Sequence, residues 1–355
     1  MHHVQLLRPS DDAAAAIGEL TTWLTDQDPA HLLIETSGST GRPKRVVLPR
    51  SAVVASVEAS ARRLGARGQW LLALPSSYVA GVQVICRSLL AGHRPLVVER
   101  LDVAGAVPAG GTTLFISLVP TQLRRLLDLP AQVEALRTIH TILLGGGPVE
   151  AALRSRAEAE GLRVVATYGS SETAGGCVYD GFPLDGVALR VGADGRVRIG
   201  GPTVFDGYDG DPALTRATLV DGWFVTSDVG RLDDDGRLHV VGRVDDVVIS
   251  GGVKVPLPAV AARLREHPAV EAVEVLGVPD EEWGSRVVAF VVGSPGSPGS
   301  PGSMVASRLC SVEDLRDWVA EVHPRSWAPR EVVVLADLPL LPTGKADREF
   351  LRGLV

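Results

Sequence analysis

Residues 35–48 read ETSGSTGRPKRVVL, and the six positions 36–41 hold two Ser, two Thr and two Gly. Glycine allows left-handed backbone and close approach of a ligand. The hydroxyls, the backbone N–H groups and Lys44 supply donors and positive charge suited to a polyphosphate. A Walker A loop would need Gly-Lys, whereas Pro43 precedes the lysine here. The stretch predicts a phosphate-binding loop between a strand and a helix that begins near Ser51.

On both sides of this loop, short apolar runs alternate with helical patterns. The candidate buried strands are 32–36, 69–75, 94–99, 113–118, 141–147 and 162–169. The candidate helices are 51–65, 82–92, 120–129 and 149–161, the last ending at Gly161. Strands that alternate with helices of this length predict an α/β domain with a largely parallel sheet.

The pattern changes after Gly181. Two β-hairpins are predicted by Asp-Gly turns at 194–195 and 235–236. A helix at 258–268, strands at 269–278 and 285–293, a helix from Ser311 and a strand at 331–338 follow. The second of these helices begins with a capping box, SVED, and its pattern places Leu315, Trp318, Val319 and Val322 on one face.

We therefore expect an α/β protein with two domains. The larger, residues 1–245, has parallel-rich sheets and a small β subdomain, and the smaller, residues 246–355, is an α+β C-terminal domain. The Gly/Ser/Pro repeat at 293–303 cannot bury apolar surface, which predicts a disordered surface loop.

Composition narrows the functional class. Apolar residues make up 45% of the chain and the net charge is −7, which favours a folded core and argues against non-specific nucleic-acid binding. Cys86, Cys177 and Cys310 lie far apart in the sequence, which predicts free thiols in a reducing compartment. There is no signal-peptide pattern and no apolar run of the ~18 residues needed to span a membrane. A cytoplasmic protein is expected.

Five motifs, in order, resemble those of the adenylate-forming enzymes, the superfamily of acyl-CoA synthetases, luciferases and adenylation domains. TSGSTGRPK (36–44) resembles the phosphate loop, LLGGGP (143–148) the glycine-rich pocket segment and YGSSET (168–173) the YGxTE motif. The stretch at 222–255 resembles WxxTGD followed by GRxDDxIxxGG, and PLLPTGKADREFLR (339–352) resembles the C-terminal PxTxxGKxxRxxL motif in shortened spacing.

The resemblance implies roles residue by residue. Glu172 holds Mg²⁺ on the triphosphate, Asp228 accepts hydrogen bonds from both ribose hydroxyls, and Asp245 is the hinge about which the C-terminal domain swivels. Lys345 is the catalytic lysine, and Tyr168 stacks on adenine. Arg243 contacts ribose or the α-phosphate. The other implied ATP-binding residues are Thr36, Ser37, Gly38, Ser39, Thr40, Gly41, Lys44, Gly145, Gly146, Gly169, Ser170 and Ser171. Gly251 and Gly252 form the coenzyme A loop.

The implied chemistry has two steps. A small-molecule carboxylate attacks the α-phosphorus of ATP to give an acyl-adenylate, and a thiol, that of coenzyme A, then expels AMP. ATP, Mg²⁺ and coenzyme A are therefore the expected cofactors and co-substrates. A homodimer is plausible for the family.

The phosphate loop begins close to the start of the chain, as in the short actinobacterial-type o-succinylbenzoate–CoA ligases of menaquinone biosynthesis, which the stretches 74–92 and 115–127 also resemble. Ser77, Tyr78 and Thr121 are candidates for the acyl pocket. o-Succinylbenzoate has two carboxylates, and Gln83 and Arg87 are further candidate hydrogen-bond donors for the one that is not activated. Ser77 and Tyr78 stand where that family often has His, Ser171 stands where Thr is usual, and Val253 replaces a common acidic residue.

Three alternatives stay open: a ligase for another acyl or aryl acid, an adenylation domain that loads a carrier protein, and a non-catalytic nucleotide-binding homologue. No carrier domain is visible in the sequence. The intact set of Lys44, Glu172, Asp228, Arg243 and Lys345 argues against a degenerate homologue.

Overall fold

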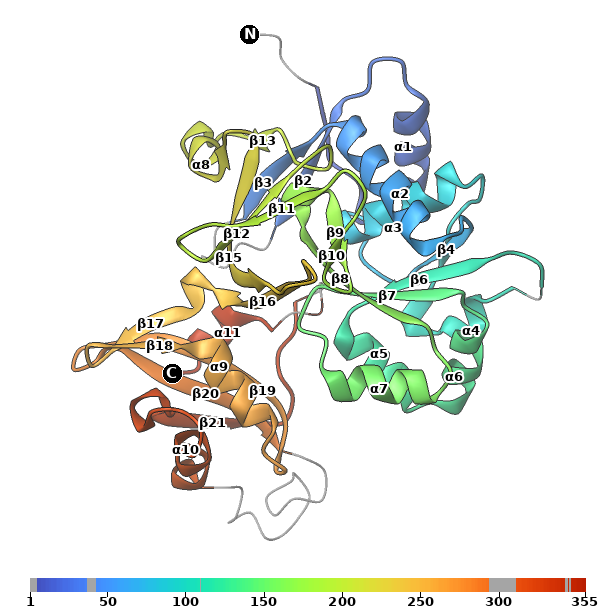
Figure 1. The fold of residues 1–355 in the computed structure, drawn as a ribbon. Helices are drawn as coiled ribbons and strands as arrows, with labels where there is room; N and C mark the ends of the chain where they lie inside the picture. Colours follow the sequence, from blue (N-terminus) through green and yellow to red (C-terminus); the bar gives the residue numbers. More distant parts are fainter. Residues whose placement is uncertain (1–4, 37–42, 109, 294–310, 342–343, 345) are drawn as a thin grey trace.

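A computed structural model describes residues 5–36, 43–108, 110–293, 311–341, 344 and 346–355 (Figure 1). The chain forms a larger part, coloured blue to yellow, and a smaller part, coloured orange to red. Its buried apolar residues fall into four clusters. Two contain residues up to Leu238 and two contain residues from Val248 onward. The predicted domain boundary after Asp245 lies between these groups and stays a prediction.

The central sheet of the larger part has seven strands. Their spatial order is β10 (Phe182–Pro183), β9 (Gly175–Tyr179), β8 (Val164–Ser170), β7 (Thr141–Leu144), β6 (Leu114–Leu118), β4 (Gln69–Leu72) and β5 (Leu96–Val97). The pairs from β8 to β5 are parallel, whereas β9 and β10 pair antiparallel. The predicted parallel-rich sheet is confirmed.

Helices cover both faces of this sheet (Figure 1). One face carries α1 (Ala13–Thr25), α2 (Arg50–Leu64) and α3 (Val79–Leu90), and the other carries α4 (Val103–Ala106), α5 (Pro120–Leu127), α6 (Pro130–Arg137) and α7 (Ala151–Ala159). Trp70 and Leu72 of β4 pack in the first cluster and Leu71 in the second, as alternation along a strand requires. Burial of both faces explains the continuous apolar runs.

The expected helix over 120–129 is wrong in its length. Helix α5 ends at Leu127, and a separate helix begins at Pro130. Steric clash with a proline ring disfavours helical backbone at the preceding residue. Leu129 is accordingly extended, with φ −118° and ψ 106°.

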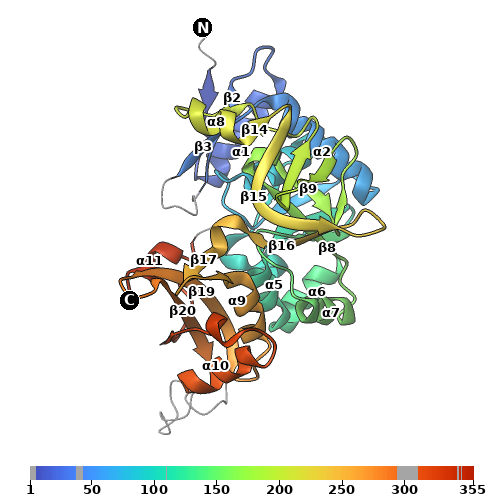
Figure 2. The ribbon, with the colours of Figure 1, turned by 60° about the vertical axis from the view of Figure 1, so that its left-hand side comes forward.

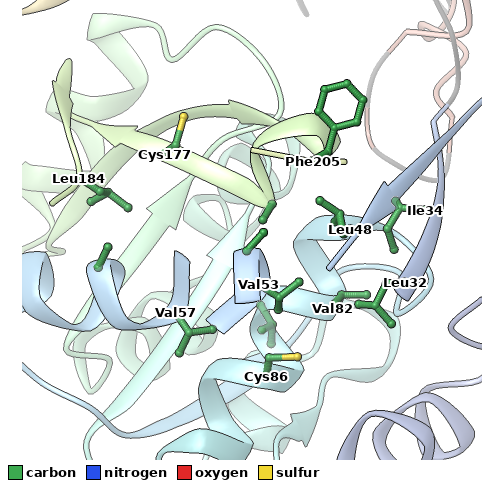
Figure 3. Packing of buried hydrophobic residues seen from close by; sticks show 14 of the residues in the cluster. Leu32, Ile34, Leu48, Val53, Val57, Val82, Cys86, Cys177, Leu184 and Phe205 are labelled. Carbon is green, nitrogen blue, oxygen red and sulfur yellow. The ribbon is translucent and has the colours of Figure 1, made fainter. Parts of the chain in front are cut away.

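Strand β2 (His31–Thr36) does not join the parallel sheet, contrary to expectation. It lies in a four-stranded sheet in the order β1 (Leu6–Leu7), β2, β3 (Lys44–Leu48) and β13 (Gly207–Tyr208). Its antiparallel partner β3 occupies residues that were expected to lead straight into a helix. Figure 3 shows Leu32 and Ile34 of β2 and Leu48 of β3 beside Val53 of α2 and Val82 of α3.

A five-stranded antiparallel sheet completes the larger part. It contains β11 (Ala188–Val191), β12 (Arg196–Gly200), β15 (Trp223–Leu232), β14 (Leu219–Val220) and β16 (Leu238–Arg243), the last paired with β15, with α8 (Pro212–Thr218) before β14. Both predicted Asp-Gly turns are confirmed, and Gly195 and Gly236 adopt φ values of 75° and 79°. Figure 2 shows the long, curved β15 leading to β16 beside the C-terminal part.

The C-terminal part contains two small sheets. One consists of β17 (Val247–Ser250) and β18 (Val253–Pro256), and the other of β19 (Val270–Asp280), β20 (Gly284–Gly293) and β21 (Glu331–Leu335). Its helices are α9 (Leu257–Arg265), α10 (Val312–Ala320) and α11 (Arg348–Arg352).

The predicted capping box of α10 is confirmed. The backbone N–H of Ser311 donates to Asp314, and that of Asp314 donates to Ser311 Oγ. Leu315 and Val319 are buried as expected, whereas Val322 is 63% exposed because the helix ends before it. The repeat at 293–303 falls almost wholly outside the described residues.

Arg348 of α11 joins two partly buried carboxylates. Its guanidinium lies 2.6 Å from Asp246 Oδ1 and 2.6 Å from Glu274 Oε1. Burial opposes its charge, but the charges of Glu274 and Asp246 outweigh that effect and raise the pKa of Arg348. The contact fixes the C-terminal helix to the segment that directly follows the predicted hinge.

We expect Arg348→Met to lower the free energy of unfolding by about 2 kcal/mol, because two partly buried carboxylates lose their cation. Urea denaturation of the purified protein measures the change. Arg352→Met on the same helix is the matched control, since Arg352 is exposed and makes no ion pair within the described part of the chain. Equal stability of the two variants would contradict the role given to Arg348.

Candidate functional site

Four neighbouring parallel strands carry most of the predicted pocket residues at their carboxyl ends. Ser77 and Tyr78 follow β4, Thr121 follows β6, Gly145 and Gly146 follow β7, and Tyr168 to Ser171 lie at the end of β8 and just beyond it. These strands are adjacent in the sheet, in the order β8, β7, β6 and β4. Ligands of open α/β sheets bind outside the carboxyl ends of the strands. The fold thus brings residues far apart in the sequence to one edge of the sheet.

Tyr168, Asp228 and Arg243 form one hydrogen-bonded group. The Tyr168 hydroxyl donates to Asp228 Oδ2 at 2.7 Å, and Arg243 Nη1 donates to Asp228 Oδ1 at 3.3 Å. Asp228 on β15 and Arg243 on β16 are directly paired across the sheet. Burial and the negative charge of Asp228 raise the pKa of Tyr168, which keeps its hydroxyl protonated as a donor.

Three residues predicted to meet adenine and ribose therefore lie together. Each carboxylate oxygen of Asp228 already has a protein partner, and each has a further lone pair with which to accept a ribose hydroxyl. The contacts with nucleotide remain proposals.

The same group reaches the predicted hinge. Arg243 Nη2 also lies 3.4 Å from Asp245 Oδ2. Asp245 belongs to a 3₁₀ turn, η3 (Val244–Asp246), through which the chain passes from β16 to β17. Arg243 thus contacts both the predicted ribose ligand and the predicted hinge residue.

Glu172 lies in a second group with Tyr208 and Lys44. It belongs to the 3₁₀ turn η2 (Ser171–Thr173), which joins β8 to β9 through Ala174 and Gly175, both with positive φ. The Tyr208 hydroxyl donates to Glu172 Oε1 at 2.8 Å. The Lys44 ammonium lies 5.7 Å from the centroid of the Tyr208 ring, within the range of a cation–π contact.

Glu172 is buried, with 7% of its surface exposed, and makes no ion pair within the described ranges. A buried carboxylate normally has a cation or metal partner. The described residues contain no gathering of three or more His, Cys, Asp or Glu side chains that would make a metal site from protein alone. Mg²⁺ is usually held by one or two carboxylates together with substrate phosphates, and Glu172 fits that arrangement.

The phosphate loop itself lies mostly outside the described residues, which include Thr36 and Lys44 at its ends but not Ser37, Gly38, Ser39, Thr40 or Gly41. Thr36 and Lys44 are directly paired on β2 and β3. Since Tyr208 on β13 pairs with Val46 of β3, the end of the loop is connected to the strand that carries the partner of Glu172.

Local geometry also accounts for three predicted ATP-binding glycines, two through close packing and one through a positive φ. A Cβ at position 145 would lie 2.3 Å from Thr167 Oγ1, and one at position 169 would lie 2.1 Å from the Gly175 carbonyl oxygen. Gly146 has φ +81°. These positions require glycine whether or not they touch the nucleotide.

The acyl-pocket candidates separate into two sets. Ser77, Tyr78 and Thr121 are half-buried at the sheet edge. Gln83 and Arg87 instead point into the core: the Gln83 amide donates to the Ala174 carbonyl at 2.8 Å, and Arg87 donates to the Tyr179 hydroxyl at 3.2 Å.

The C-terminal part meets the same edge. Gly344 has φ +76°, and a Cβ there would lie 2.6 Å from Val119 Cγ2 and 3.4 Å from Thr121 Oγ1. Lys345 follows Gly344 directly in the sequence and lies outside the described residues. The predicted coenzyme A loop is the two-glycine turn of the β17–β18 hairpin, with φ 56° at Gly251 and 78° at Gly252. Its role in binding stays a prediction.

Sequence reasoning missed Tyr208. The residue sits in a two-residue strand between glycines at 207 and 210, where no apolar period marks a strand. Its position depends on pairing with β3, far away in the chain. Only the spatial arrangement shows that it contacts both Glu172 and Lys44.

The two described cysteines lie in the apolar core. Cys86 and Cys177 are free and buried, and burial raises the pKa of each thiol to about 12. Figure 3 shows both within the apolar packing. Cys310 lies outside the described residues.

Two family models match the chain. That of the AMP-binding enzymes matches residues 6–209, and that of the AMP-binding enzyme C-terminal domain matches residues 259–345. The two matched ranges do not overlap and follow one another along the chain.

Among curated proteins, the chain is 40% identical to a probable 2-succinylbenzoate–CoA ligase of Mycobacterium tuberculosis, over 98% of this chain and 92% of that protein. Among solved structures it resembles the o-succinylbenzoate CoA synthetase of Bacillus subtilis in complex with the acyl-adenylate intermediate, with a TM-score of 0.75 and 29% identity over 90% of this chain and 68% of that one. The same synthetase with ATP and magnesium ion matches with a TM-score of 0.73 and 28% identity, over 90% and 69% of the two chains.

Proposed function

The chain belongs to the family of AMP-binding enzymes, and we propose that it is an ATP-dependent o-succinylbenzoate–CoA ligase that works through an acyl-adenylate. One observation carries the choice of substrate: the 40% identity to the mycobacterial protein, which spans 98% of this chain. The reaction is that of an acid–thiol ligase, and its pathway is menaquinone biosynthesis.

In the first step, a carboxylate oxygen of the acid forms a bond to the α-phosphorus of ATP, and the bond to the departing pyrophosphate breaks. The nucleophile and the phosphate are both negative, so positioning and charge stabilisation dominate the catalysis. Tyr168 stacks on the adenine, Asp228 and Arg243 hold the ribose, and the loop that ends at Lys44 receives the β- and γ-phosphates. Glu172 would hold Mg²⁺, which would supply positive charge to the triphosphate.

In the second step, the thiol of coenzyme A forms a bond to the acyl carbon, and the bond to AMP breaks. We infer that the C-terminal part rotates about Asp245 between the two steps. Lys345 serves the first step, and the Gly251–Gly252 turn faces coenzyme A in the second. The contact of Gly344 with Val119 and Thr121 supports this assignment, because it brings the residue before Lys345 to the acyl-pocket edge.

The expected location is the cytoplasm, which the two free thiols support. Within the described ranges, none of the helices combines the length and apolar character needed to cross a bilayer. A homodimer stays a prediction.

We expect pyrophosphate release that depends on coenzyme A with o-succinylbenzoate and no comparable turnover with benzoate or fatty acids. The measurement follows pyrophosphate in the presence of ATP and Mg²⁺, each acid being assayed with and without coenzyme A. Turnover with a different acid would retain the mechanism and reject the substrate. Binding of ATP without turnover on any acid would favour the non-catalytic homologue.

A further inference from the structure

The carboxylate of Glu172 accepts a hydrogen bond from the side chain of Tyr208. Within the part of the chain that the structure describes, the Tyr208 hydroxyl is the only hydrogen-bond donor to it, at 2.8 Å from Oε1. Both side chains are buried, with 7% of Glu172 and 6% of Tyr208 exposed. A hydrogen bond to a charged group in such surroundings is stronger than one between neutral groups.

We propose that Tyr208 is a positioning residue, whose hydroxyl fixes the Glu172 carboxylate for the metal–nucleotide complex before that complex arrives. The inference rests on the proposed function only in taking MgATP as the ligand. It assigns a role to a residue outside every motif quoted above.

The backbone around Tyr208 holds the donor in place. Its strand β13 pairs with β3, and its N–H donates to Thr215 Oγ1 at 2.9 Å. Its ring meets Phe205 edge-on, with the centroids 4.9 Å apart. The N–H of Phe205 in turn donates to the Glu172 carbonyl oxygen at 2.9 Å. Donor and acceptor thus belong to segments that are hydrogen-bonded to each other.

The electrostatics suit a permanent donor. A tyrosine hydroxyl is an ordinary hydrogen-bond donor at neutral pH, and the carboxylate of Glu172 is its acceptor here. The hydroxyl engages Oε1, while no described residue hydrogen-bonds Oε2. A carboxylate held by one oxygen retains the other for a cation, which is the preorganisation that a binding site needs.

Lys44 makes Tyr208→Phe an informative substitution. The ammonium lies over the aromatic ring, which phenylalanine retains. The substitution therefore removes the hydroxyl alone and leaves the contact between the ring and the phosphate-loop lysine.

The test titrates the purified full-length protein with a non-hydrolysable ATP analogue, with and without Mg²⁺, by calorimetry. We expect Tyr208→Phe to raise the Kd of the Mg²⁺ complex about 10-fold, the effect of one lost hydrogen bond to a charged group. The Kd of the metal-free analogue should not change. Because binding is measured, a protein that fails to turn over o-succinylbenzoate still tests this inference.

Tyr179→Phe is the matched control. It also removes a buried tyrosine hydroxyl, one that lies 2.8 Å from Ser60 Oγ in the core. We expect it to leave both Kd values unchanged. An unchanged Kd of the Mg²⁺ complex in Tyr208→Phe, or an equal loss with and without metal, would overturn the proposal.

A double-mutant cycle covers the case in which Tyr208→Phe folds but is too unstable for calorimetry. Glu172→Gln removes the buried charge, so Tyr208→Phe should lower the Tm less in the Glu172→Gln background than in the native one. A fall in Tm of the same size in both backgrounds would show that Tyr208 does not act through Glu172.

Discussion

Lys345→Ala is expected to lower the rate of adenylate formation at least about 10²–10³-fold, the range seen when one stabiliser of transition-state charge is removed. The attacking carboxylate and the α-phosphate are both negative, and Lys345 is the cation placed by the motif at 339–352 where the two must meet. Pyrophosphate release with saturating o-succinylbenzoate and MgATP measures this step.

The second step should be largely intact in the same variant. Thiol attack on a supplied acyl-adenylate takes place at the acyl carbon, after pyrophosphate has left, and by then the C-terminal part should have carried Lys345 away. Consumption of coenzyme A thiol with synthetic acyl-adenylate measures this step. An equal fall in the rates of both steps would contradict the proposal that Lys345 acts in the first step and is carried away before the second.

Lys254→Ala is the matched control for the first step. Lys254 is exposed on β18 and is the other lysine of the C-terminal part. The Lys254→Ala variant should form adenylate at the native rate. That result would separate the role of Lys345 from a general effect of removing a positive charge.

Asp228→Ala is expected to raise the KM for ATP about 10- to 100-fold and to affect the acid KM little. The substitution removes the acceptor proposed for two ribose hydroxyls, and it leaves Tyr168 and Arg243 without the oxygens they now contact. Initial rates of pyrophosphate release at varied ATP measure the effect. An unchanged KM for ATP would reject the ribose assignment.

Two further variants assign the cause. Tyr168→Phe keeps the ring that should stack on adenine and loses the hydroxyl bonded to Asp228, so a much smaller rise in KM is expected. Asp233→Ala removes another aspartate of the same sheet region, one that bonds His239 at 2.9 Å, and should leave the KM unchanged.

The sequence predicted the features that local patterns determine. Apolar runs located β8, which carries Tyr168, and β6, which Thr121 follows, because a strand buried on both faces has few polar residues to interrupt its apolar run. The Asp-Gly turns located the hairpin that pairs Asp228 with Arg243, because a glycine at the turn tolerates positive φ. Together these patterns located the strands that carry Tyr168, Asp228 and Arg243.

Features that depend on distant pairing could not be predicted in the same way. An apolar run does not reveal whether its neighbour is parallel, so β2 was expected in the wrong sheet. Tyr208 lies in a strand of two residues whose existence depends on β3. The helix break at Leu129 could have been predicted from Pro130, because proline disfavours helical backbone at the residue before it. The apolar periodicity on both sides of the break instead favoured one continuous helix.

Two close approaches between described residues of the larger part and the C-terminal part, that of Gly344 to Val119 given above and one at Gly242, bear on whether such parts are interchangeable between relatives. A Cβ at Gly242 on β16 would lie 3.2 Å from Pro258 of α9, and one at Gly344 would lie 2.6 Å from Val119. Each contact pairs a glycine on one side with a bulkier residue on the other. A C-terminal part grafted from another enzyme would have to match both pairs, so the compatibility of a graft is decided by these four positions as much as by overall identity.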